Sequence, residues 1–159
     1  MALLCLFFEI SMAQTQEDSV QVKPKLVRHY AGLSVTSTGG YGLSYRYFPE
    51  QLGFQFTGFP YKNGEDYEFN LGFSLLQRLV EAEKSKMYAY YSFSYYEYRR
   101  NNDNGFNKYE EGSNFSYGGG LGVSFFLIEE LVLDLRAGLG GYSGPVFTLS
   151  GGVGFYYAF

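Results

Sequence analysis

Eight stretches of this sequence alternate between bulky apolar residues and small or polar residues. They span residues 27–35, 40–48, 52–59, 67–79, 87–98, 114–126, 131–140 and 146–159. Because successive side chains of a β-strand point to opposite faces, strict alternation predicts a strand with one apolar face. The predicted fold class is therefore all-β, with eight strands that follow one another along the chain.

The lengths of these stretches and of their links predict a closed barrel. A strand that crosses a membrane at a tilt needs roughly 9–11 residues, which is close to the length of most of the stretches. Consecutive strands with short links form an antiparallel up-and-down sheet, and closure removes its free edges. We expect a closed eight-stranded antiparallel up-and-down transmembrane β-barrel over residues 27–159, with both termini on one side.

The composition agrees with strands and excludes other classes. The chain has 17 Tyr, 16 Phe and 21 Gly; Tyr and Phe favour strands, whereas frequent Gly disfavours helices. Since no run of about 18 apolar residues occurs, no transmembrane helix is expected. The net charge is −4 without a basic stripe, so no nucleic-acid partner is expected.

The two faces of the predicted strands differ in a way that favours a membrane. One face is almost unbroken Leu, Phe, Tyr and Val, which suits lipid and would aggregate in water. The other carries Gly and Ser, which suit the narrow lumen of eight strands, and few of the long charged side chains of a solvated surface. The fifth stretch is aromatic on both faces, and we orient it with Ser92 and Ser94 inside. The alternatives are a soluble lipocalin-like barrel that binds a small hydrophobic ligand and a Tyr/Gly-rich fibre or coat protein.

The links divide between the two ends of the barrel. With both termini in the periplasm, the links near residue 37 and at 60–66, 99–113 and 142–145 face outward, and those near 49 and at 81–86 and 128–130 face the periplasm. The longest polar link, 99–113, is the expected contact surface for a cell-surface ligand or adhesion partner. Its candidate contact residues are Arg99, Arg100, Asp103, Phe106 and Tyr109.

The first 26 residues are expected to lie outside the barrel. Residues 1–8 are nearly all apolar, and Ser11 and Ala13 match a small-x-small signal peptidase site. We expect a signal peptide over 1–13, cleaved before Gln14, and a periplasmic lead-in over 14–26. No basic residue precedes the apolar run and Glu9 interrupts it, so a short N-terminal strand or helix is the alternative. Cys5, the only cysteine, would leave with the signal, and its context does not fit a lipoprotein site.

Four charged residues fall on the predicted lumen face. They are Arg46, Glu68, Asp134 and Arg136. Because buried charge is costly unless it is paired, we expect a structural cluster centred on Asp134, with Glu68 nearer the outer rim. A proton or ion path is the functional alternative, but an eight-stranded lumen is normally filled by its own side chains.

The end of the chain carries a resemblance to a known family. Val153, Phe155, Tyr157 and Phe159 alternate back from the terminal Phe. This resembles the C-terminal signal that outer-membrane proteins present to the barrel-assembly machinery. With the eight stretches, the chain resembles the small OmpA/OmpX-type barrels, most of all the Tyr/Gly-rich barrels of Bacteroidota. The resemblance implies a monomer in the lipid of the bacterial outer membrane and no single activity.

Catalysis, cofactors and metals are not expected. Lipid hydrolases and acyltransferases of the outer membrane pair a His with a Ser, but His29 lies at the periplasmic end on the lipid face. The Gly-rich runs 118–122 and 151–154 precede no helix, so they are not phosphate-binding loops. The expected function is a structural or cell-surface interaction role, with a lipid-modifying enzyme as a further alternative.

Overall fold

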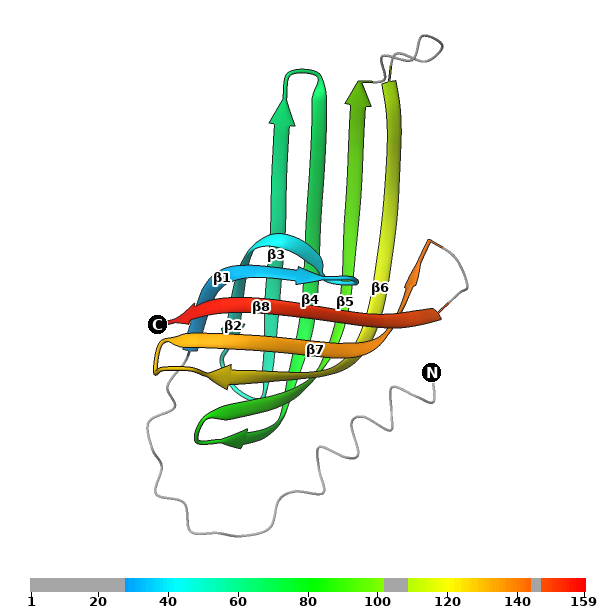
Figure 1. The fold of residues 1–159 in the computed structure, drawn as a ribbon. Helices are drawn as coiled ribbons and strands as arrows, with labels where there is room; N and C mark the ends of the chain where they lie inside the picture. Colours follow the sequence, from blue (N-terminus) through cyan, green and yellow to red (C-terminus); the bar gives the residue numbers. More distant parts are fainter. Residues whose placement is uncertain (1–27, 102–108, 144–146) are drawn as a thin grey trace.

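The computed structural model describes residues 28–101, 109–143 and 147–159, and these form eight strands. The strands are β1 (Arg28–Thr36), β2 (Gly40–Phe48), β3 (Leu52–Asn63), β4 (Asp66–Ala82), β5 (Ser85–Asn101), β6 (Tyr109–Phe126), β7 (Leu131–Tyr142) and β8 (Phe147–Ala158). Each strand pairs antiparallel with the next, and β1 also pairs with β8, which closes the barrel (Figure 1). The predicted fold class is confirmed. No helix within the described ranges is long and apolar enough to cross a membrane.

Alternation places polar side chains inside the barrel and apolar side chains outside. On β1, Ser34 is buried whereas Leu33 and Val35 are exposed, because neighbouring residues point to opposite faces. The same pattern continues around the barrel. The orientation predicted for β5 is confirmed, since Ser92 and Ser94 are both buried in the lumen.

The four central strands extend well beyond the others at one end of the barrel (Figure 1). Their extensions form a four-stranded antiparallel sheet made of residues 59–63, 66–70, 95–101 and 109–115. We call this the protruding sheet. β2 reaches only to the level of Gly58 of β3, and β7 reaches only to Ser116 of β6, so the protruding sheet has a free edge on each side.

Several predicted links are strands in the structure. The predicted loop at 60–66 is shorter in the structure, because β3 runs to Asn63 and β4 starts at Asp66. The turn between them has Gly64 in a left-handed conformation (φ 61°). The predicted polar loop at 99–113 is strand at both of its ends, since β5 runs to Asn101 and β6 starts at Tyr109. The predicted turn at 81–86 shortens to the two residues between Ala82 and Ser85. In each case paired main chains supply the hydrogen bonds of a hairpin whatever the polarity of the side chains.

Pro60 lies on the free edge of the protruding sheet in β3. A proline fits an edge strand because its missing N–H group costs no ladder bond when it points away from the neighbouring strand. Lys62 lies two residues further along the same edge. Proline and lysine are the residues with which natural sheets protect free edges from pairing with other chains.

Some predictions fall outside the described residues. These are the signal peptide over 1–13, the lead-in over 14–26, and the contact candidates Asp103 and Phe106. The side chain of Tyr109 lies outside them as well, although its main chain begins β6.

Candidate functional site

The lumen contains a cluster of three charged side chains from two strands. Arg46 projects from β2, and Asp134 and Arg136 project from β7, one alternation apart. Arg46 Nη1 lies 3.0 Å from Asp134 Oδ2, and Arg136 Nε lies 3.1 Å from Asp134 Oδ1. Asp134 therefore lies between the two guanidinium groups, and all three side chains are almost fully buried.

Asp134 also accepts hydrogen bonds from two neutral side chains. The Ser124 hydroxyl of β6 donates to Oδ2 at 2.7 Å, and the Tyr88 hydroxyl of β5 lies 2.7 Å from both carboxylate oxygens. Tyr88 in turn accepts from Arg136 Nε at 3.0 Å. A buried carboxylate with this many donors is fully compensated, which is the condition under which a buried ion pair is tolerated.

Gln55 of β3 links the two arginines of the cluster. Its carbonyl oxygen accepts from Arg46 Nε at 3.0 Å and from Arg136 Nη2. Its amide nitrogen donates to Thr57 at 3.1 Å and to Ser34 of β1 at 3.4 Å. The network thus joins opposite walls of the lumen. We call it the lumen network, comprising Ser34, Ser44, Arg46, Gln55, Thr57, Ser74, Tyr88, Ser124, Asp134, Arg136 and Tyr156.

The two guanidinium groups outnumber the one carboxylate in this cluster, and aromatic rings take up the excess positive charge. Arg46 Cζ lies 4.4 Å from the centroid of Tyr156 and 5.4 Å from that of Tyr88. Arg46 Nη2 has no hydrogen-bond partner and no accessible surface. Since no water-sized space adjoins this nitrogen, the attraction of the guanidinium to the rings replaces a polar partner.

Glu68 does not join the lumen network. It lies on β4 in the protruding sheet, where its carboxylate accepts a hydrogen bond from the Tyr41 hydroxyl. Arg100 Nη2 of β5 lies 4.0 Å from its other oxygen. The predicted lumen charges therefore divide into a buried group of three and a separate, partly exposed carboxylate at the long-strand end.

Two of the candidate contact residues, Arg99 and Arg100, lie on β5 in the protruding sheet. Arg99 Nε lies 3.0 Å from Glu111 Oε1 on the adjacent β6, and both side chains are exposed. Arg100 lies over the ring of Tyr98 at 5.6 Å on the opposite face. The two arginines thus present cations on different faces of this sheet, because they are neighbours in one strand.

His29 lies at the other end of the barrel, beside the end of the chain. Its main chain pairs with Phe159 through two hydrogen bonds of 2.9 and 3.0 Å. Its ring stacks on Phe159 and packs against Tyr47, and Nδ1 lies 2.5 Å from the Tyr45 hydroxyl. These contacts belong to an aromatic cluster on the outer face, without a serine that the imidazole could activate among its described polar partners.

The C-terminal residues lie where the alternation predicts. Val153, Phe155, Tyr157 and Phe159 are all exposed on the outer face of the barrel. Tyr156 and Ala158 of the same strand point into the lumen and are buried. The outward row is therefore available to lipid or to another protein during assembly.

The charged side chains of the lumen are held by one another and by neighbouring polar groups. Apart from Arg46 Nη2, the charged, amide and hydroxyl groups of the lumen network are hydrogen-bonded mainly to one another. No described group of three or more His, Cys, Asp or Glu side chains could hold a metal ion. A lipocalin-like barrel would place apolar side chains and a hydrophobic ligand where this lumen holds Arg46, Gln55 and Arg136.

Sequence reasoning did not assign Tyr88 and Tyr156 to the lumen. Tyr88 lies an even number of residues from Ser92 on β5, and Tyr156 lies an even number from Gly154 on β8. Each tyrosine therefore shares a strand face with a small residue of the lumen, and this spacing was the signal that could have placed it there. Tyrosine combines an apolar ring with a polar tip, so it fits either face of a barrel. The presence of aromatic residues on a strand therefore does not show which of its faces points into the lumen.

Comparison with solved structures supports the fold. No protein-family model and no curated protein sequence matches the chain. Among solved structures, the chain is similar to the N-terminal β-barrel domain of Pseudomonas aeruginosa OprF, with a TM-score of 0.54 and 15% identity over 84% of this chain and 96% of that one.

Two further structures have the same architecture. Neisserial surface protein A matches with a TM-score of 0.50 and 18% identity, covering 83% of this chain and 94% of that one. The Escherichia coli outer membrane protein W matches with a TM-score of 0.50 and 12% identity, covering 86% of this chain and 100% of that one. At these identities the likeness establishes a common barrel fold.

Proposed function

We propose that this chain is an integral protein of the bacterial outer membrane, with a structural or cell-surface interaction role. The observation that carries the proposal is the inversion of polarity, with charged and hydroxyl side chains inside and apolar side chains outside. Leu33, Leu43 and Leu135 are at least 45% exposed, whereas Arg46 and Asp134 are at most 2% exposed. Water would disfavour this arrangement and lipid favours it.

An aromatic belt on the outer face supports the same proposal. Phe56, Phe73, Phe93 and Phe115 project from four consecutive strands, and each ring centroid lies 5.0–6.3 Å from the next. Contacts at these distances stabilise neighbouring strands. In water such a belt would expose its apolar rings, whereas a bilayer covers them.

The first test is the gel mobility of the full-length protein, extracted from outer membranes in detergent and run boiled and unboiled. A closed barrel that resists SDS runs faster unboiled than boiled, and we expect that shift. A single unshifted band from a soluble fraction would contradict the membrane proposal and would favour the soluble lipocalin-like alternative. A lipid-modifying enzyme would require His29, so unchanged lipid A and phospholipid profiles in H29A cells would contradict that alternative.

We propose that the protruding sheet and the link between β5 and β6 face the cell exterior. Arg99 and Glu111 are exposed on its outer face, beyond the apolar belt. The test is a membrane-impermeant maleimide applied to intact cells that carry C5S with E111C, with S92C in the lumen as the matched control. Labelling of E111C alone is expected, whereas labelling of neither in intact cells but of E111C in lysed cells would reverse the orientation.

A contact role for this surface rests on Arg99, Arg100, Asp103, Phe106 and Tyr109. The test compares cells that display the wild type with cells that display R99A/R100A or lack residues 102–108, on bare and collagen-coated polystyrene. If the surface mediates attachment, both variants attach less while their gel shifts persist. Unchanged attachment would remove the support for an adhesive role and leave a structural one.

The remaining partners follow from the proposed location. The exposed row of Val153, Phe155, Tyr157 and Phe159 supports recognition by the barrel-assembly machinery, and the belt supports contact with outer-membrane lipid. The monomeric state and the resemblance to Tyr/Gly-rich barrels of Bacteroidota stay predictions.

A further inference from the structure

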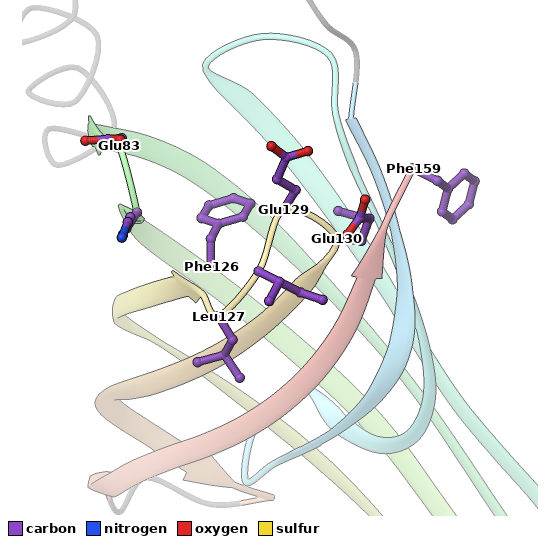
Figure 2. Close-up of a pocket in the computed structure, with 9 residues that line it drawn as sticks. Glu83, Phe126, Leu127, Glu129, Glu130 and Phe159 are labelled. Atoms are coloured by element: carbon purple, nitrogen blue, oxygen red, sulfur yellow. The ribbon is translucent and has the colours of Figure 1, made fainter.

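A hollow lies at the end of the barrel where β1 begins and β8 ends. It has a volume of about 680 Å³ and is formed by the β4–β5 turn, the β6–β7 turn and the end of β8. We call it the mouth hollow. Its apolar lining includes Phe126, Leu127 and Ile128, and Figure 2 shows Phe126 between the turn that carries Glu83 and the turn that carries Glu129.

The rim of the mouth hollow is acidic. Glu83, Glu129 and Glu130 line it, with Lys84 as the only cation of the lining. Within the described ranges, none of the three carboxylates has a side-chain hydrogen bond or an ion pair. By contrast, nearby Glu81 pairs with Lys86 at 2.7 Å and with Arg78. The mouth hollow therefore combines apolar surface with a net negative charge that its own neighbours leave uncompensated.

The chain itself supplies a segment of complementary chemistry directly before β1. Residues 20–27 read Val-Gln-Val-Lys-Pro-Lys-Leu-Val, so Lys23 and Lys25 are their only charges and four of the eight residues are aliphatic. The charge of this segment is opposite to that of the mouth hollow and of similar size. Its aliphatic residues match the apolar lining, so both components of the mouth hollow have a counterpart in the segment.

The segment also starts from the right place. The main chains of His29 and Phe159 are hydrogen-bonded to each other, and Phe159 lines the mouth hollow. The barrel is roughly 16 Å across, given eight tilted strands spaced about 4.8 Å apart. Eight extended residues reach roughly 26 Å, so residues 20–27 can cross the opening.

We propose that residues 20–27 of this chain dock in the mouth hollow, with Lys23 and Lys25 paired to Glu83, Glu129 and Glu130. Docking buries aliphatic side chains and brings the two ammonium groups of the segment next to the three carboxylates of the rim. Because the segment is tethered, its effective concentration at the mouth hollow is high, on the order of millimolar.

The test uses trypsin on the full-length protein folded in detergent. Lys23 precedes Pro24 and resists trypsin, so Lys25–Leu26 is the first cleavable bond of the segment, and mass spectrometry follows its cleavage. We expect slow cleavage in the wild type and cleavage on the order of tenfold faster in E83Q/E129Q/E130Q, because proteolysis follows the undocked population. The control E65Q/E97Q/E110Q removes as much charge at the opposite end and should cleave like the wild type.

High salt gives an independent readout on the unmodified chain. In 1 M NaCl the screening length falls to about 3 Å, so cleavage of the wild type should accelerate toward the rate of the triple variant. Equal rates for the wild type and the triple variant, at both salt concentrations, would overturn the proposal.

Cross-linking decides the case if the triple variant fails to give the folded gel band. In a C5S background, a short bismaleimide should join K25C to E129C within one chain, and K25C to E110C should not be joined. Absence of the first link, or its formation only between two copies, would overturn docking within the chain. Because this test does not depend on a membrane, its failure is distinguishable from failure of the proposed location.

Discussion

At the scale of single residues, Asp134 is the centre of the lumen network. Its carboxylate accepts hydrogen bonds from the side chains of four residues on four different strands, which are Arg46, Arg136, Tyr88 and Ser124. Each of these donors loses water when the barrel closes, and the carboxylate replaces that water. A change at Asp134 therefore affects several buried groups together.

We predict that D134N strongly destabilises the barrel. Asparagine keeps the shape of the side chain but leaves two buried guanidinium groups without a counter-charge, which costs about 3–5 kcal/mol. Urea unfolding in detergent, followed by loss of the fast-running gel band, measures the effect. The control is E111Q, which breaks an exposed pair with Arg99 and should cost less than about 1 kcal/mol. Equal stability of the two variants would show that the network is not structural.

Gly122 gives a second residue-scale prediction, because it makes room for Tyr88. A Cβ atom on Gly122 would lie 2.3 Å from Cζ of Tyr88, whose hydroxyl is held by Asp134 and Arg136. G122A should therefore cost about 1–3 kcal/mol in the same unfolding assay. Gly151 is the matched control, since its nearest neighbour would lie 3.6 Å away, and G151A should change stability by less than about 0.5 kcal/mol. A tolerated G122A would mean that the Tyr88 ring can shift.

At the scale of elements, the sequence predicted the number, order and facing of the strands but not the ends of the central four. Within the barrel, the apolar outer face and the packed polar lumen give a clear contrast between alternate residues. In the protruding sheet both faces carry polar residues, so the sequence predicts loop at residues such as Lys62, Arg100 and Glu111, which the structure places in strands. Their strands are held by main-chain pairing, which side-chain polarity does not reveal.

The candidate site was predictable to a similar extent. Parity placed Arg46, Asp134 and Arg136 on the lumen face, and position along the strands separated Glu68 from them. The distances that make Gln55 a bridge between two arginines depend on how far β3 is shifted relative to β2 and β7. That shift depends on the packing of the whole barrel, so no local pattern reports it.

The β4–β5 turn should become less stable in acid. Burial alone raises the pKa of Glu81, but hydrogen bonds from Lys86 and Arg78 outweigh it and lower that pKa below the ordinary glutamate value. A lowered pKa contributes stability that is complete above the unfolded value of roughly 4.3 and is lost as pH falls through the folded value. E81Q should therefore be less stable than the wild type at pH 7, by under about 1 kcal/mol, and equally stable at pH 3. Urea midpoints at the two pH values measure this, and an unchanged difference at pH 3 would contradict it.

At the scale of the whole molecule, the lumen network joins residues from every strand. Ser34 of β1 and Tyr156 of β8 belong to it, so the network is complete only when the first and last strands meet. Closure of the barrel and formation of the network are therefore one event. A barrel that lacks either strand would leave buried charge exposed to lipid or water.

We predict that the barrel unfolds as a single cooperative unit. Loss of strand signal in far-ultraviolet circular dichroism and loss of the fast-running gel band should have the same urea midpoint, because no strand can leave without disrupting the network. D134N should move both midpoints together. Separate midpoints would mean that part of the barrel opens independently of its lumen.

The free edge that carries Pro60 bears on how closely these molecules can be packed. In a crowded membrane, neighbouring copies collide edge to edge far more often than soluble proteins do, because they share one plane and one orientation. If the edge strand of the protruding sheet were flat and unprotected, colliding copies could pair through it by main-chain hydrogen bonds. Repeated pairing would build rows of copies. Pro60 and Lys62 oppose main-chain pairing at this edge, so they prevent the first step of such a row. In the proposed membrane location, the β3 edge therefore does not start such rows, which favours free diffusion of neighbouring copies.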